Sequence, residues 1–598
     1  MAPLPVPEAP PLAHLSAADL HRLLAPCTTA AGRPLIFTNW ATTFRSQTTA
    51  VFRPTTVEQV RWAVELARRE GRELRAAGAG HSPSDIVCTD GYLVDLKGLS
   101  KVLDVDSAAQ TFHAEGGITL HNLHPAIAAQ GQLALPSLGS ISDQTLAGAI
   151  STSTHGSGVS FPSLSTGTTF LDIVLPLPDA PVVRVSRAED QDPDLFHAAL
   201  CGLGAVGIVV GVGMRAERVF RLEEECFSMR FDEFTRRWQE IAESAQHVRC
   251  WWFPQVGRVK ISRMNRTTKP ITPRPSALSI WFSDIFLAKH VHALALFAAR
   301  YVPTLLPYHA WFMWTFVHQP GPVRWGEFLC GLWSRLSGRT TSAGPWPRVE
   351  ELEMLGKEAE REEEAAGAAA KAERDGGMSR HVPPPYSRAE DALNTNSASA
   401  VPTSFGKSVP WPILEDEPTY RVDESVAIFN YDCGFPQYTY ESCVPYASTG
   451  AALYALNDWH TRELARPGYP LRAHFPIEIR WTDRDEGWLS PTQGGRGCYL
   501  GAIQYRPYNL PVPYRAHFGR FAALLSTRFS ARPHWAKSHA LTPDDLSALY
   551  PRFGEFVAVR ARVDPERVLA NAYVRRHLLG EVRRDEMERE GRRWKARP

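Results

Sequence analysis

The nine cysteines of this chain form no Cys-x-x-Cys pair, and their number is odd. A structural zinc site or a disulfide framework needs closely spaced or paired cysteines, so the sequence favours neither. The expected setting is a reducing compartment or a cytosol-facing surface. The cysteines are scattered: Cys27, Cys88, Cys201, Cys226, Cys250, Cys330, Cys433, Cys443 and Cys498.

The chain also lacks an excess of charge. Its formal net charge is +1 over 598 residues, which argues against a dedicated nucleic-acid surface, so no nucleic-acid partner is expected. The first 26 residues are rich in proline and contain neither a basic segment nor an Arg-rich amphipathic pattern. No signal or transit peptide is therefore evident.

A long uninterrupted apolar run is missing too. The most membrane-like segment, 277–318, is broken by charges and prolines, whereas a spanning helix needs about 20 continuous apolar residues. Three interpretations stay open: a membrane span, a helical hairpin buried in the protein, and a surface that contacts a membrane interface. The interrupting residues are Asp284, Lys289, Arg300, Pro303 and Pro307.

The remaining pattern predicts an α+β protein with two or more domains. Residues 56–71 and 121–131 read as amphipathic helices that end in glycine. Short β-like runs occupy 91–96, 102–106, 111–120, 171–177 and 206–216. The predicted divisions are a tail at 1–36, a first domain at 37–220, a second domain at 221–337 and 420–598, and a charged, Ala-rich, low-complexity insertion at 338–419.

Residues 76–85, "AAGAGHSPSD", place His81 directly after a glycine turn. An isolated histidine of this kind can be an ordinary turn residue. A metal site is weakly supported, because Asp85 is the one possible ligand close by in sequence. A dinucleotide-binding glycine loop fits poorly, because Pro83 follows where a helix should begin.

Two further stretches of small residues accompany this turn. Residues 135–158, "LPSLGSISDQTLAGAISTSTHGSG", offer glycines, hydroxyls and backbone N–H groups that can approach a flat or anionic ligand closely. Residues 202–212 give a tight turn that leads into an apolar strand. Together they suggest an extended cofactor lying across an α+β domain, and the alternative is a set of tight turns between buried strands.

The block 43–218 resembles the FAD-binding domain of flavoproteins of the vanillyl-alcohol oxidase type. Within that group, "GAGHSPSDIVCTDGYLVDL" and the distant "RPHWAK" (532–537) resemble the aldonolactone oxidases, such as the fungal D-arabinono-1,4-lactone and animal L-gulonolactone oxidases. The resemblance covers about 37–335 and 420–585. It implies a two-subdomain FAD-binding domain followed by an α+β substrate (cap) domain.

The same resemblance implies how the cofactor is held. His81 would be bonded through its imidazole to the 8α carbon of FAD, and imidazole is a suitable nucleophile near neutral pH. No metal is expected. The implied FAD-binding residues are His81, Gly78, Ala79, Gly80, Ser82, Gly139, Ser140, Gly148, Ser153, His155, Gly156, Gly207 and Ile208.

The substrate residues are expected in the second domain. In "FPIEIRW" (475–481), Glu478 and Arg480 point to one side of a strand, and the pair could equally be a solvated surface patch. By resemblance they bind substrate hydroxyls next to the flavin, together with His534 and Lys537 of "RPHWAK". The Lys537 ammonium could stabilise negative charge on the flavin or bind a sugar hydroxyl.

The implied reaction oxidises an aldono-1,4-lactone with O₂ to an ascorbate-type product and hydrogen peroxide. D-arabinono-1,4-lactone, giving D-erythroascorbate, is the favoured substrate; the L-gulono and L-galactono lactones, open-chain alditols and a non-enzymatic flavin carrier are the alternatives. Gly139 is expected to leave oxygen a path, unless it merely permits a positive φ. By resemblance the expected location is the mitochondrial outer membrane, with contact through 277–318.

Overall fold

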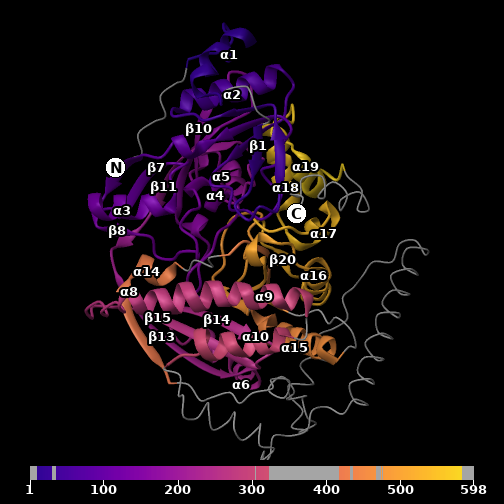
Figure 1. The fold of residues 1–598 in the computed structure, drawn as a ribbon. Helices are drawn as coiled ribbons and strands as arrows, with labels where there is room; N and C mark the ends of the chain where they lie inside the picture. The colour runs from indigo at the N-terminus through magenta and orange to yellow at the C-terminus, as the bar shows by residue number, and fades with distance from the viewer. Residues whose placement is uncertain are drawn as a thin grey trace, which may run out of the picture.

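The computed structural model describes residues 10–29, 35–302, 305–321, 417–430, 435–465, 473–474 and 476–581. The predicted insertion at 338–419 lies outside the described residues, apart from residues 417–419. Two halves are stacked in Figure 1, with the N-terminal half above and a large sheet below.

The N-terminal half contains two main sheets. A parallel sheet has the strand order β3-β5-β4, and an antiparallel sheet has the order β10-β9-β11-β7-β6. The predicted helices are confirmed, and each of the five predicted β-like runs contains a strand. The bounds are β3 (Ala50–Phe52), α2 (Val57–Arg69), β4 (Leu74–Ala77), β5 (Tyr92–Asp95), β6 (Val102–Asp106), β7 (Thr111–Glu115), α3 (Leu120–Gly131), α4 (Leu146–Ser151), β9 (Thr168–Val174), β10 (Val182–Ser186), α5 (Pro193–Ala199) and β11 (Ile208–Arg215).

Helix α2 shows why the sequence pattern succeeds. Its apolar residues recur at helical spacing and are buried against the parallel sheet. The Thr56 side chain accepts a hydrogen bond from the Gln59 N–H and so caps the first turn. Gly71, with φ of +59°, lies just beyond the last turn.

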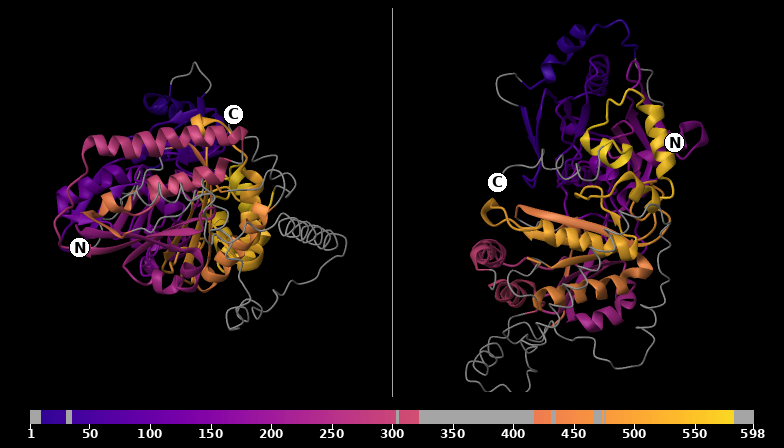
Figure 2. Two further views of the ribbon diagram at one scale, coloured as in Figure 1. Left: turned by 60° about the horizontal axis from the view of Figure 1, so that its bottom comes forward. Right: turned by 90° about the vertical axis from the view of Figure 1, so that its right-hand side faces the viewer.

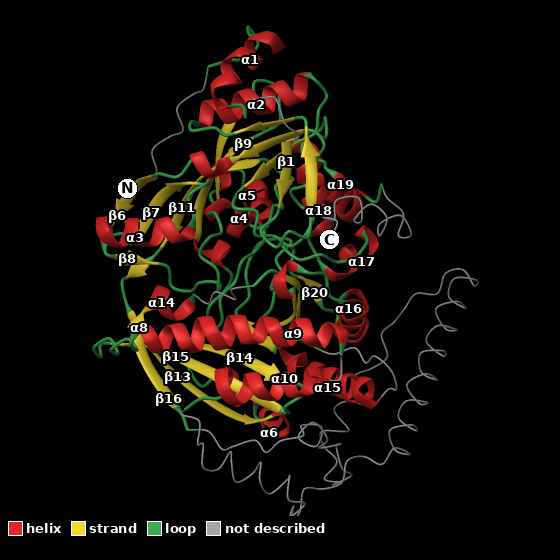
Figure 3. Ribbon diagram, viewed as in Figure 1, coloured by secondary structure: helices red, strands yellow, loops and turns green. Residues whose placement is uncertain are grey.

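The lower half is built on an eight-stranded sheet with the order β16-β13-β15-β14-β18-β19-β17-β20. Figure 3 shows strands β13, β15 and β16 of this sheet below helix α9, with α6 at the lower edge. One face packs against α6 (Phe231–Arg236), α15 (Thr449–Ala465) and α16 (Arg515–Phe529). The strands are β13 (Arg221–Arg230), β14 (His247–Phe253), β15 (Arg258–Thr267), β16 (Thr419–Glu424), β17 (Gln437–Pro445), β18 (Ile477–Thr482), β19 (Gly497–Tyr505) and β20 (Arg532–Pro533).

The end of the chain returns to the N-terminal half. Helices α17 (Pro543–Leu549), α18 (Phe553–Val563) and α19 (Ala572–Val574) and the helical turn Arg575–Leu579 share one apolar core with α5 and the five-stranded sheet. Figure 2 (right) shows this yellow segment beside the indigo and purple half. At the other end, α1 (Ala17–Leu24), inside the predicted tail, packs on α2.

The apolar segment 277–318 forms helices that cross the front of the large sheet in Figure 1. Ala277–Tyr301 is a continuous helix comprising α8 (Ala277–Ile280), a π-helical stretch and α9 (His292–Tyr301), and α10 (Leu306–Met313) follows. By length and composition the helix Ala277–Tyr301 could cross a membrane, and only 19% of its most apolar window is buried inside the protein. The α9 end packs on the sheet through Leu296 and Tyr505, whereas Leu278 is 75% exposed.

Candidate active site

A cleft opens in the N-terminal half at the junction with the large sheet. About 1010 Å³ of space outside protein atoms lies in it, including some open solvent. Its walls come from five separate parts of the chain, namely residues 75–87, Leu96, and residues 141–152, 203–209 and 534–537.

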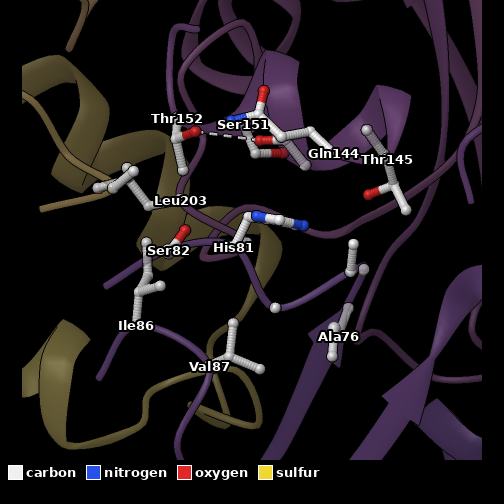
Figure 4. A pocket seen from close by; sticks show the side chains of 18 of the residues that line it. Ala76, His81, Ser82, Ile86, Val87, Gln144, Thr145, Ser151, Thr152 and Leu203 are labelled. Atoms are coloured by element: carbon white, nitrogen blue, oxygen red, sulfur yellow. Dashed lines mark hydrogen bonds between the residues drawn. The ribbon is translucent and has the colours of Figure 1, made fainter. Parts of the chain in front are cut away.

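The glycine turn after β4 brings His81 into this cleft (Figure 4). Gly80 has φ of +70°, a conformation that favours glycine. A Cβ on Gly78 would lie 2.1 Å from the Thr145 Oγ1, so only glycine lets the turn pass this close to α4. The Trp40 ring stacks on His81 with 5.3 Å between the ring centroids. The turn therefore fixes an imidazole at the wall of the cleft.

The other predicted cofactor residues fall into two groups. Those that line the cleft with His81 are Gly78, Ala79, Gly80, Ser82, Gly148, Gly207 and Ile208. Those outside its lining are Gly139, Ser140, Ser153, His155 and Gly156.

The loop that contains Ser153 and Gly156 is tightly packed. The Ser153 hydroxyl is 2.9 Å from that of Ser490, and a Cβ on Gly156 would lie 2.1 Å from the Ser137 Oγ. Gly139 does not have a positive φ, so the alternative explanation of this glycine as a left-handed turn residue is wrong. A Cβ there would lie 3.1 Å from the Thr154 methyl carbon.

Glu478 and Arg480 lie on β18, on the face of the large sheet that turns toward the N-terminal half. The alternation is confirmed, because Ile477 and Ile479 are fully buried in the core on the opposite face. Arg480 Nη2 donates to Glu478 Oε1 and to the Ser140 hydroxyl. The pair is therefore no solvated patch: the Arg480 side chain is 9% exposed, and it joins the two halves of the molecule.

Glu441 on β17 connects the other candidate residues. Its Oε2 is 3.9 Å from the Lys537 ammonium, and its Oε1 is 3.4 Å from His155 Nε2. Burial opposes ionisation of Glu441, but the hydrogen bond from His155 and the charges of His155 and Lys537 outweigh it and hold the pKa of this carboxyl well below its usual range. Glu441 is thus an ionised carboxylate that lies beside the cleft residue Lys537, although Glu441 itself is not part of the cleft lining.

His534 and Lys537 both line the cleft. His534 Nδ1 accepts a hydrogen bond from the Ala536 N–H at 3.2 Å, so the ring proton of neutral His534 lies on Nε2. Burial lowers the pKa of His534 to about 3, which keeps the ring neutral near pH 7. In this form His534 can donate a hydrogen bond to a ligand through Nε2.

The nitrogen and oxygen atoms of His155, Glu441 and His534 lie within 4.8 Å of one another, a spacing that could hold a metal ion. The Lys537 ammonium beside the carboxylate would repel a divalent cation. The His534 tautomer also presents a proton, not a lone pair, on Nε2. We assign no metal to this group, and the absence of a metal stays a prediction.

Comparison with known proteins identifies the chain. The D-arabinono-1,4-lactone oxidase family matches residues 212–328 and 396–577, and the FAD binding domain family matches residues 48–186. The chain belongs to the aldonolactone oxidase family. It is an FAD-dependent oxidase of aldonolactones, and the predicted α+β fold with an FAD-binding and a substrate domain is confirmed.

Relatives of this aldonolactone oxidase cover most of its length. It is 28% identical over 539 residues to L-gulonolactone oxidase of Scyliorhinus torazame, covering 90% of this chain and 97% of the relative. It is 29% identical over 571 residues to a putative D-arabinono-1,4-lactone oxidase of Neurospora crassa, covering 92% and 86%. Cholesterol oxidase from Brevibacterium sterolicum has the same fold, with a TM-score of 0.63, 14% identity and coverage of 91% and 96%.

The residues that line the cleft suit FAD in their chemistry. Close-packed glycines leave backbone exposed along its wall, and a Cβ on Gly148 would lie 2.8 Å from the Thr145 Oγ1. Gly207, with φ of +128°, continues this lining on the far side. Such a glycine-rich wall suits a flat ring system and a pyrophosphate held by backbone N–H groups.

Sequence reasoning gave no role to Glu441, which contacts Lys537, or to the Asp85–Arg576 pair, which lies outside the cleft lining. Glu441 stands in an ordinary strand pattern, and Arg576 stands in a C-terminal helix without a motif. Asp85 was noticed only as a weak metal ligand. Each acquires its partner across hundreds of residues, so no local pattern marks it.

Proposed function

We propose that this aldonolactone oxidase acts on D-arabinono-1,4-lactone, with FAD bound covalently to His81. The observation that carries the proposal is the placement of His81, His534 and Lys537 on one cleft. The family match to D-arabinono-1,4-lactone oxidase favours this substrate. The L-gulonolactone oxidases among the relatives make L-gulono- and L-galactono-1,4-lactone the alternatives.

The side chains divide the work on the lactone. Arg480 offers planar donors and Glu478 an acceptor, which together would orient the ring hydroxyls. Lys537 places positive charge where negative charge develops, and neutral His534 donates a further hydrogen bond. When bound, FAD would supply the acceptor for the hydride from the hydroxyl-bearing carbon, with O₂ as the final electron acceptor and hydrogen peroxide as the second product.

The substrate is tested by a peroxide-coupled assay with purified protein. The panel contains the D-arabinono, L-gulono and L-galactono lactones and several alditols, and the product is identified by mass spectrometry. We expect the highest kcat/KM with D-arabinono-1,4-lactone. A preference for an alditol would overturn the lactone assignment, and bound FAD without turnover on any of these compounds would favour a flavin carrier.

The covalent bond is tested separately. Acid precipitation of the wild-type protein should leave flavin with the protein, and His81→Ala should release it. Release of all flavin from the wild-type protein would show that His81 does not form the bond.

We also propose contact with a membrane, with the mitochondrial outer membrane as the expected location. Helix α8 and the following π-helical turn present Leu278, Trp281 and Phe282, which are 75%, 49% and 51% exposed. Aromatic and aliphatic side chains of this kind enter the membrane interface. Flotation with liposomes should be strong for the wild type and weak for Trp281→Ser/Phe282→Ser; equal flotation of the two would refute the contact.

A further inference from the structure

The loop that follows His81 has no regular secondary structure between His81 and Cys88. Its polar groups therefore need partners from elsewhere. Trp40 N–H donates to the Gly80 carbonyl at 2.8 Å, and the Asn39 side chain donates to the Ser82 carbonyl at 3.0 Å. These bonds hold the start of the loop, next to the imidazole.

The rest of the loop is held by the C-terminal segment. The Ser538 hydroxyl donates to the Pro83 carbonyl at 3.2 Å, and Asn571 Nδ2 donates to the carbonyls of Ile86 and Cys88, each at 3.0 Å. Ser538 directly follows the cleft residue Lys537. The distant C-terminus thus supports both the loop of His81 and the "RPHWAK" segment.

The strongest of these contacts is an ion pair. Arg576 Nη2 donates to both oxygens of Asp85, at 2.9 and 2.8 Å, and both side chains are 5% exposed. The two residues are 491 positions apart in sequence. A buried charge without its partner is costly, so this pair forms only where the loop and the C-terminal turn are both in place.

We propose that Arg576 and Asp85 are positioning residues that set the loop so that His81 can bond to FAD. The inference deepens the proposed covalent attachment and rests on it. The C-terminal turn Arg575–Leu579 then controls when the flavin is attached, because the loop lacks its anchor until the end of the chain has folded. Neither residue lines the cleft.

The attachment itself balances without a further reagent. One C–H bond of the flavin methyl group and the imidazole N–H bond are replaced by an N–C bond. The two electrons and two protons released are taken up by O₂, the acceptor of this oxidase, as hydrogen peroxide. The protein has only to hold the imidazole against the methyl carbon, and a misplacement of about 1 Å can slow such a step about 100-fold.

The test compares two buried ion pairs of the C-terminal segment. Arg576→Met breaks the pair with Asp85. Arg560→Met, the control, breaks the Arg560–Asp564 pair, which is 2.8 Å long with side chains 4% and 0% exposed. Asp564 accepts further hydrogen bonds from the Val568 and Leu569 N–H groups of its own segment. Each full-length apoprotein, produced under riboflavin starvation, is mixed with FAD in air. Covalent flavin is followed by fluorescence on denaturing gels and by intact mass, and the melting temperature is measured in parallel.

We expect Arg576→Met to attach FAD about 10- to 100-fold more slowly than wild type. The variant should still bind FAD non-covalently, so that denaturation releases the flavin. Arg560→Met should lose thermal stability but attach FAD at the wild-type rate. If Arg576→Met fails to fold, Arg576→Lys keeps the charge but loses the guanidinium that reaches both Asp85 oxygens through Nη2 while Nε donates to His577. This variant should show about tenfold slower attachment.

Three results would overturn the inference. Wild-type attachment rates in Arg576→Met or in its lysine counterpart would leave the pair a purely structural role. Equal slowing in Arg560→Met would show a general effect of stability. A wild-type protein without covalent flavin would overturn the bond at His81 itself, and the positioning role with it.

Discussion

Replacement of Glu441 by glutamine removes a carboxylate that faces both His155 and Lys537. Glutamine keeps the size of the side chain and one carbonyl acceptor, so the change is chiefly the loss of charge. The Glu441 side chain is 13% exposed, and breaking a buried pair costs about 3–5 kcal/mol. A neutral hydrogen bond retains about 1 kcal/mol, so we expect the variant to be less stable by about 2–4 kcal/mol at pH 7.

The loss of stability should depend on pH with a definite sign. Because the folded protein holds the pKa of Glu441 below its usual value, the stabilisation is complete above the unfolded pKa of about 4.3 and fades as the pH falls toward the folded pKa. The melting temperatures of wild type and Glu441→Gln should therefore differ most at pH 6–8 and converge in acid. Differential scanning calorimetry of the two proteins, from acid pH up to pH 8, gives both melting temperatures at each pH.

The same variant should also slow substrate oxidation. Without its carboxylate partner the Lys537 ammonium is free to move, and a loss of about 1.4–2.7 kcal/mol in the transition state gives a 10- to 100-fold slower reduction of bound flavin. Anaerobic stopped-flow mixing with lactone gives this rate directly.

The control for this variant is Glu463→Gln. Glu463 is a buried carboxylate on α15 that pairs with Arg520 at 2.6 Å and does not line the cleft. We expect it to lose stability and keep the wild-type reduction rate. Wild-type reduction in Glu441→Gln, or equal slowing in Glu463→Gln, would refute the assigned role of Glu441.

Three further outcomes follow from the site and the core. Arg480→Lys should lower kcat/KM about tenfold, because a point charge cannot replace the planar guanidinium. Arg506 is a buried arginine that donates to the Ala41 carbonyl, and the control Arg506→Lys should leave kcat/KM unchanged. Gly139→Ala should slow reoxidation by O₂ but not reduction by lactone, with an artificial acceptor restoring turnover; parallel loss of both would refute oxygen gating. Burial lowers the pKa of His460 to about 3, so the unfolded chain alone takes up this proton below pH 6.5, and His460 should contribute about 1.4 kcal/mol per pH unit to the loss of stability down to pH 5. His460→Phe should make the overall slope in thermal unfolding shallower by this amount, and parallel curves would contradict it.

The sequence alone determined the features that depend on local geometry. A glycine turn that aims His81 can be predicted because positive φ and close approach both demand glycine, as Gly80 and Gly78 show. The shared face of Glu478 and Arg480 on β18 can be predicted because successive side chains of a strand alternate between its two faces. Family resemblance added the link between these motifs and FAD.

Tertiary structure decided which charges meet. Glu441 faces Lys537, and Asp85 faces Arg576, only because β17 packs beside β20 and the C-terminal turn packs against the loop that follows His81. It also gave Gly139 an ordinary φ and a position against Thr154, where the sequence allowed a left-handed turn. Pairing between distant residues depends on how whole elements pack against one another. Side-chain periodicity predicts only the face of an element on which a residue lies, and it does not predict which residue of another element contacts it.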